Sequence, residues 1–349
     1  MNDKLIKLAY EFRATELWEA LADNDIFAVQ LHDGNIGYCS VMGNSGCHYS
    51  LGLYIGETGW NSYLDNIRIA RQEDSEECSQ AMSKMDCINC DFTPMNEAQK
   101  GEAWEQVVRF GLENGIDIKN HPGIPEFLRF RPYLYPGIGL NGDDELYMTE
   151  ALRAALFIAR QIGGCMHPMD LGFTLEGLHV SEKAGQIVPF IIRKGRSYSI
   201  GETNLPGRTP VTNPKPVFSS PELALSIMQL KPGPDKECRQ LMLPAPVMEK
   251  GSNPFFPVTV LQVDSTDGHV AMTQAKRYSV ESVSETVVEI AMQFIGSGTC
   301  PRKIYVMDDI TQDLLEDFCR KCGILLIRAS RLKHLKEAWS YLNEMLRTR

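Results

Sequence analysis

A proline-rich stretch near residue 215 most constrains how this chain can fold. The segment NLPGRTPVTNPKPVFSSPE places five prolines between Pro206 and Pro221. Proline fixes φ and lacks a backbone N–H, so it is excluded from helix interiors and central strands. At 349 residues the chain also exceeds the size at which a single core usually stops growing. We therefore predict two domains, residues 1–215 and 216–349.

The two predicted domains differ in charge. The chain has 35 Lys and Arg residues against 45 Asp and Glu residues, a net charge of −10. From Val217 onward the two counts are 16 and 16, so the first part holds 19 basic and 29 acidic residues. An acidic domain repels polyanions at long range. The charge thus disfavours nucleic acid as a partner and leaves a small molecule or a protein.

The first residues and the cysteine content indicate a cellular compartment. The opening MNDKLIKLAYEFRATELWEALADND spreads acids and bases through an apolar pattern, which predicts an amphipathic helix rather than a signal peptide. No apolar run reaches the roughly 18 residues of a membrane span. Ten cysteines without a secretory signal are typical of reduced thiols. We expect a cytoplasmic protein that has no membrane partner.

Two cysteines and a histidine stand close together in GYCSVMGNSGCHYSLGLYIG, residues 37–56. An Asp-Gly pair before this segment and a glycine-bounded turn inside it predict three antiparallel strands. With Met42 opposite Cys47, alternation places Cys39 and His48 on one face and Cys47 on the other. Zinc needs three or four ligands, so this set is too small. We interpret the segment as part of an antiparallel sheet in an α+β domain.

A second group of cysteines has a spacing that suits a metal. In ECSQAMSKMDCINCD, Cys78 precedes the pair Cys87 and Cys90, which has the C-x-x-C spacing of zinc ligands. These three are the candidate metal ligands, although no fourth ligand is evident. The later pair Cys319 and Cys322 ends a helix, where the dipole opposes a thiolate, and we interpret both as core residues.

Aromatic and guanidinium groups alternate with prolines in NHPGIPEFLRFRPYLYPG. Arg129, Arg131, Tyr133 and Tyr135 are our candidate ligand-binding residues, because arginine forks suit carboxylate or phosphate. Two interpretations are open. The ribbon presents a binding surface, or its aromatic rings pack on the sheet while its arginines offset the acidic domain.

No cofactor is indicated. GIGLNG, from Gly137 to Gly142, matches G-x-G-x-x-G, but it follows a proline-containing segment and runs into three acidic residues. A dinucleotide fingerprint must follow a strand and open a helix that accepts pyrophosphate. Three carboxylates at that position would repel the ligand while stabilising the helix dipole. The sequence also lacks the zinc-protease, P-loop and serine-hydrolase motifs.

The second domain has a clear order of elements. A hairpin, a helix, a strand, a second helix, a strand and a last helix give the order ββαβαβα, which predicts an α/β domain with a mixed sheet. That order resembles the ribonuclease-H-like fold, in which carboxylates at strand ends hold metal ions. Asp264, Asp308 and Glu289 are the candidate catalytic residues on this resemblance. Glu289 falls on the solvent side of the predicted helix, away from the apolar stripe.

Two further stretches carry a family resemblance. DIFAVQLHDGNIGYCSVMG with YSLGLYIGETGWNSY, and PVTVLQVDSTDGHVAM with PRKIYVMDDITQDLLEDFCRKCGILLIRAS, resemble an uncharacterised bacterial two-domain family. The resemblance supports the two-domain division and transfers no catalytic residue, so whether the protein is an enzyme stays open. We expect a ligand-binding or protein-interaction module. The alternative is a metal-dependent phosphodiesterase in the second domain.

Overall fold

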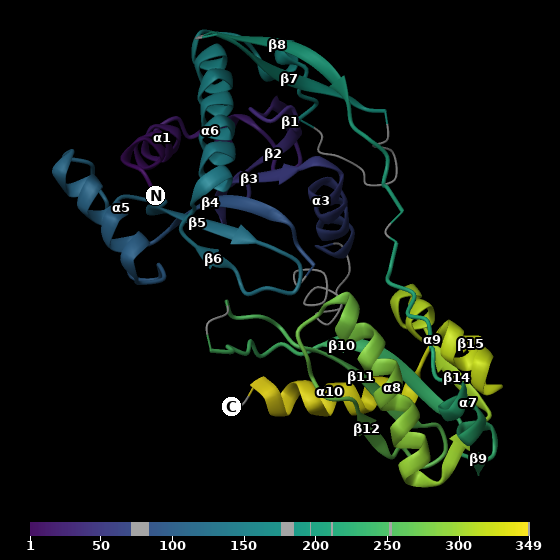
Figure 1. Ribbon diagram of the computed structural model, residues 1–349. Helices are drawn as coiled ribbons and strands as arrows, with labels where there is room; N and C mark the ends of the chain where they lie inside the picture. The colour runs from purple at the N-terminus through teal and green to yellow at the C-terminus, as the bar shows by residue number, and fades with distance from the viewer. Residues whose placement is uncertain (71–83, 176–184, 196, 211, 251–252, 348–349) are drawn as a thin grey trace. The chain divides into compact units, whose positions relative to one another are not determined.

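The chain forms two compact units. The computed structural model describes residues 1–70, 84–175, 185–195, 197–210, 212–250 and 253–347 (Figure 1). One unit comprises Met1–Pro132 with Pro136–Thr209, and the other comprises Tyr133–Tyr135 with Pro210–Arg349. Each unit has its own hydrophobic clusters. The change from one unit to the other after Thr209 falls inside the proline-rich segment.

The first unit is built on an eight-stranded sheet in the order β6-β5-β4-β3-β2-β1-β7-β8. Neighbouring strands run antiparallel except β1 and β7, which are parallel. The antiparallel sheet predicted for this part of the chain is therefore present, with one parallel pair added. The strands are β1 (Ile26–Gln30), β2 (Ile36–Met42), β3 (Tyr49–Ile55), β4 (Cys87–Thr93), β5 (Ile124–Phe130), β6 (Gly137–Ile138), β7 (Ile187–Lys194) and β8 (Ser197–Asn204).

Helices cover both faces of this sheet (Figure 1). On one face the long α6 lies against the strands beside α1 and α5, and its buried face is made mainly of alanine and leucine. On the other face α3 places Trp60 and Tyr63 over the strands. No helix in the described part of the chain is long and apolar enough to cross a membrane. The helices are α1 (Asp3–Arg13), α2 (Leu17–Ala20), α3 (Gly56–Ala70), α5 (Glu102–Glu113), α6 (Gly142–Gly163) and the 3-10 helix η1 (Pro168–Leu171).

The pairing of β2 with β3 differs from the register that the sequence predicted. Met42 lies opposite Ser50 rather than Cys47, because the chain uses a longer connection between the two strands. Cys39 consequently faces the core under α6, while His48 reaches Asp91 with Ser50 on the opposite face. The prediction that Cys39 and His48 share a face is wrong, since a change of register moves side chains between faces.

The second unit contains a five-stranded mixed sheet in the order β12-β11-β10-β14-β15. β10, β11 and β12 pair antiparallel, whereas β14 and β15 run parallel to β10. Helices separate β12 from β14 and β14 from β15, so the predicted mixed α/β sheet is present. The order ββαβαβα is incomplete, because β10 precedes the predicted hairpin and pairs between β11 and β14 in the middle of the sheet. Its elements are α7 (Pro221–Met228), β9 (Lys231–Gly233), β10 (Lys236–Met242), β11 (Val258–Asp264), β12 (Val270–Met272), α8 (Val280–Ser297), β13 (Thr299–Pro301), β14 (Lys303–Val306), α9 (Asp309–Cys322), β15 (Leu325–Arg328) and α10 (Lys333–Arg347).

Candidate functional site

The candidate catalytic carboxylates of the second unit lie at different levels of the sheet. Asp264 sits opposite Lys236 on β10, and Lys236 is level with Ile304 on β14. Asp308 comes four residues after Ile304, about 13 Å further along at the usual rise per residue. Among the described residues no group of three His, Cys, Asp or Glu side chains is placed to hold a metal ion.

Each of these carboxylates already has structural partners. Asp264 forms an ion pair with Lys236. Asp308 begins α9, where its Oδ1 accepts the backbone N–H of Thr311 at 2.8 Å and its Oδ2 lies 3.2 Å from Arg239. Glu289 accepts a backbone N–H from the segment after β12 at 2.6 Å. The structure thus does not group the three carboxylates. Asp264 forms an ion pair beside a turn, Asp308 caps a helix, and Glu289 holds the segment after β12.

The candidate metal cysteines are divided between the two faces of the first sheet. Cys87 and Cys90 stand three residues apart on β4, so their side chains point in opposite directions. Cys87 packs in the cluster under α3 and Cys90 in the cluster under α6. Burial raises the pKa of both thiols, which disfavours the thiolate that a metal needs. The two cannot bind one ion together, and Cys78 lies outside the described residues.

The arginines of the predicted ligand-binding ribbon are occupied by acidic side chains. Arg129 lies 2.6 Å from Asp86 and 3.2 Å from Asp144, and Arg131 lies 2.6 Å from the other oxygen of Asp144. In the second unit Tyr133 stacks on Tyr278 at 4.2 Å, and Tyr135 packs against Phe256 at 5.9 Å. Of the two interpretations of this ribbon, these contacts favour packing and charge neutralisation.

Arginines gather instead in a pocket of the first unit of about 310 Å³. Arg153 and Arg160 come from α6, and Arg193 comes from the end of β7. No Asp or Glu is among the described residues that line the pocket. The Nε of Arg193 donates to the carbonyl of Gly195 at 3.0 Å, which leaves its two terminal amino groups for a ligand. The described lining of the pocket therefore carries three guanidinium groups and no carboxylate.

The other part of the same pocket is apolar and aromatic. Leu8 of α1 and Leu156 of α6 line it together with Phe157 and Tyr198. The two aromatic rings lie 5.7 Å apart with their planes inclined by 32°. Tyr198 is near the start of β8, so the hairpin of β7 and β8 supplies both an arginine and a ring. Arginines and rings alternate along this lining: Phe157 lies between Arg153 and Arg160 on α6, and Tyr198 is the cross-strand partner of Arg193. A ligand in this pocket therefore meets guanidinium groups and aromatic rings side by side.

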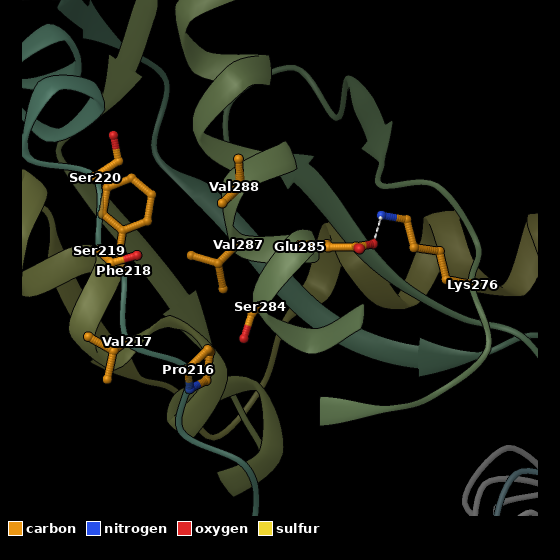
Figure 2. A pocket seen from close by; sticks show the side chains of 10 residues that line it. All are labelled: Pro216, Val217, Phe218, Ser219, Ser220, Lys276, Ser284, Glu285, Val287 and Val288. Atoms are coloured by element: carbon orange, nitrogen blue, oxygen red, sulfur yellow. Dashed lines mark hydrogen bonds and ion pairs between the residues drawn. The ribbon is translucent and has the colours of Figure 1, made fainter. Parts of the chain in front are cut away.

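The second unit has a different cavity, an open groove of about 340 Å³ (Figure 2). Figure 2 shows Val217 and Phe218 on the extended segment at one side and Val287 on α8 at the other. Its charged lining residues, Lys276 and Glu285, pair with each other at 2.9 Å. The groove therefore offers apolar contact with no unpaired charge among its described lining residues.

Comparison with known families accounts for most of the chain. Residues 3–170 match the family model described as Domain of unknown function (DUF7309). Residues 227–343 match the model described as Domain of unknown function (DUF6930). The two models match separate parts of the chain. No curated protein matches its sequence.

Solved structures resemble the protein only weakly. The HTLV-2 integrase catalytic core domain in complex with magnesium, in its trimeric form, is 15% identical over 34% of this chain and 72% of that chain, with a TM-score of 0.26. The simian T-cell lymphotropic virus intasome in complex with PP2A regulatory subunit B56 gamma gives 16% identity, 34% and 40% coverage and a TM-score of 0.25. Likenesses of this size carry no argument about either domain.

Sequence reasoning missed the arginine pocket, although part of it was visible. Arg153, Phe157 and Arg160 follow one another at intervals of four and three residues within the DUF7309 match, a spacing that puts them on one helical face. Arg193 and Tyr198 lie beyond the matched residues. The hairpin of β7 and β8, which carries Arg193 and Tyr198, joins the sheet of the first unit through the parallel pairing of β7 with β1.

Proposed function

We propose that the first unit binds a small phosphorylated molecule in the pocket between α6 and the hairpin of β7 and β8. The observation that supports this is that Arg153, Arg160 and Arg193 line one pocket with no carboxylate among its described lining residues. Guanidinium groups bind phosphate through paired hydrogen bonds, and a doubly charged phosphate balances several of them better than one carboxylate does. At about 310 Å³ the pocket also reaches the size of small-molecule sites.

The charge of the unit strengthens the proposal. Elsewhere in this acidic unit, arginines such as Arg129, Arg131 and Arg208 lie in ion pairs with aspartates. Like charges that line one pocket repel each other, and the described lining of this pocket supplies no carboxylate to offset its three guanidinium groups. A bound phosphate removes that repulsion and gains charge-assisted hydrogen bonds.

Calorimetric titration tests this function. Inorganic phosphate and ribose 5-phosphate are titrated into the wild-type protein and into Arg160→Gln and Arg193→Gln. Losing one charged hydrogen bond weakens binding about tenfold or more. Arg109→Gln is the matched control, because Arg109 is exposed on α5 outside the pocket and its replacement removes the same charge. The absence of phosphate binding in the wild type, or an equal loss in all three variants, contradicts the proposal.

A metal-dependent phosphodiesterase in the second unit has no comparable support. Asp264 and Asp308 lie about four residues apart along the sheet and are paired with Lys236 and Arg239. A two-metal site needs carboxylates that share ions about 4 Å apart. The apolar groove of the second unit does not contain Asp264 or Asp308 among its described lining residues. Our proposed function rests on the arginine pocket of the first unit alone.

A further inference from the structure

The two aromatic rings that line the arginine pocket indicate a narrower class of ligand. We infer that the bound phosphate belongs to a mononucleotide, with its base against Phe157 and Tyr198 and its phosphate toward the arginines. This inference rests on the proposed function and deepens it. A phosphate ion alone would contact the guanidinium groups and leave Leu8 and the accessible parts of the two rings facing water.

The two rings are suited to a flat partner. Phe157 and Tyr198 are each half-buried, so part of each ring remains accessible from the pocket. They come from different elements, a helix and a strand, and are held against each other at 5.7 Å. Every base has a π-face, and stacking of a base on an aromatic side chain adds about 1–3 kcal/mol, roughly five- to a hundredfold in affinity.

The arginines flank the two rings, so they can reach the phosphate of the same molecule. Arg153 is half-buried, while Arg160 and Arg193 are exposed at the edge of the pocket. A nucleotide can therefore place its ring over Phe157 and Tyr198 while its dianionic phosphate stays within reach of guanidinium groups. Arginine also stacks its own planar group on aromatic surfaces, which adds contact to the base.

The charge of the unit favours a monomeric nucleotide over a nucleic-acid chain. A polymer would bring a row of phosphates toward a unit with excess negative charge, whereas a mononucleotide brings one phosphate to the place where positive charge is concentrated. The pocket volume of about 310 Å³ also suits a single small ligand.

The test compares ligands that differ only in the ring. AMP, GMP and UMP are titrated by calorimetry beside ribose 5-phosphate and inorganic phosphate, using the full chain. The variants are Phe157→Leu and Tyr198→Leu, two sites on separate elements, with Tyr341→Leu, an exposed residue of α10, as the aromatic control. Thermal unfolding of each variant confirms that it is folded.

We expect at least one mononucleotide to bind about tenfold tighter than ribose 5-phosphate. We also expect Phe157→Leu or Tyr198→Leu to abolish that difference while leaving ribose 5-phosphate binding unchanged. Equal binding of nucleotides and ribose 5-phosphate, lost together in Arg193→Gln, overturns the nucleotide inference and leaves the proposed function standing. Failure of every phosphate to bind overturns both.

Discussion

A single histidine gives the first unit a pH-dependent contact. His48 Nε2 lies 3.6 Å from Asp91, whose carboxylate also accepts the Ser50 hydroxyl at 2.5 Å. Asp91 is buried on its strand, whereas the His48 side chain is more exposed. The neighbouring Asp91 carboxylate raises the pKa of His48 above its usual value of 6.5. The charged imidazolium is thus the form that this contact stabilises.

The sign of the pH dependence follows from that direction. Because the folded pKa of His48 is raised, its contribution to stability is complete below about pH 6.5 and falls as the pH rises through the folded pKa. We expect the difference in unfolding free energy between wild type and His48→Gln to shrink between pH 6 and pH 8.5. NMR titration of His48 should also show its pKa fall in Asp91→Asn. A difference that grows with pH would refute this assignment.

Burial should make most of the thiols chemically slow. Burial raises the pKa of Cys238 to about 12 from 9.0, which lowers its thiolate fraction at neutral pH about thousandfold. Cys47 and Cys165 are exposed. We expect a thiol reagent to modify Cys47 and Cys165 in the native protein well before Cys87, Cys90 or Cys238, as measured by mass spectrometry of peptides over time. Early labelling of Cys87 or Cys90 would show that β4 is more open than the structure has it.

At the scale of the element, Asp308 is a helix cap. Its Oδ1 accepts both the backbone N–H and the hydroxyl of Thr311, which is fully buried. Asparagine can also accept these bonds, whereas alanine leaves the first turn of α9 without a side-chain cap.

The two substitutions should therefore differ in effect. We expect Asp308→Ala to lower the free energy of unfolding by about 1–2 kcal/mol and Asp308→Asn by much less, measured by urea unfolding. Asp309→Ala, one residue later on an exposed side chain, is the matched control. An equal loss in Asp308→Asn and Asp308→Ala would indicate that the negative charge, rather than the cap, is what matters.

The sequence predicted helices and strands better than it predicted which strands and side chains contact one another. The apolar stripe of α8 was visible because Val283, Val287 and Ala291 recur at helical spacing, and all three are buried. The register of β2 against β3 was not, since the length of a glycine-containing connection decides it. The arginines of the predicted ribbon have no evident partner in the sequence. Folding brings Asp86, just before β4, and Asp144, in the first turn of α6, next to them.

At the scale of the whole molecule, the proline-rich segment and the change in charge divide the chain at the same place, near residue 215. Two units with separate cores allow ligand binding in one to act on that unit alone, because binding stabilises only the folded state that contains the site. The first unit has more acidic than basic residues, so a pocket lined by three arginines differs from the rest of that unit in charge. The second unit has equal numbers of basic and acidic residues from Val217 onward and an apolar groove in place of a charged one.

Hydrogen exchange followed by mass spectrometry can measure this separation. Saturating ligand at about 100 times its dissociation constant adds about 2.7 kcal/mol to the stability of the unit that binds it. We expect AMP, or ribose 5-phosphate where no nucleotide binds, to slow exchange in α6, β7 and β8 and to leave β10 and β11 unchanged. Arg193→Gln, which lacks one guanidinium group of the pocket, should show a much smaller effect at the same ligand concentration. Equal slowing of exchange in both units would mean that the two units unfold together. That result would contradict the expectation, which is based on their separate hydrophobic cores.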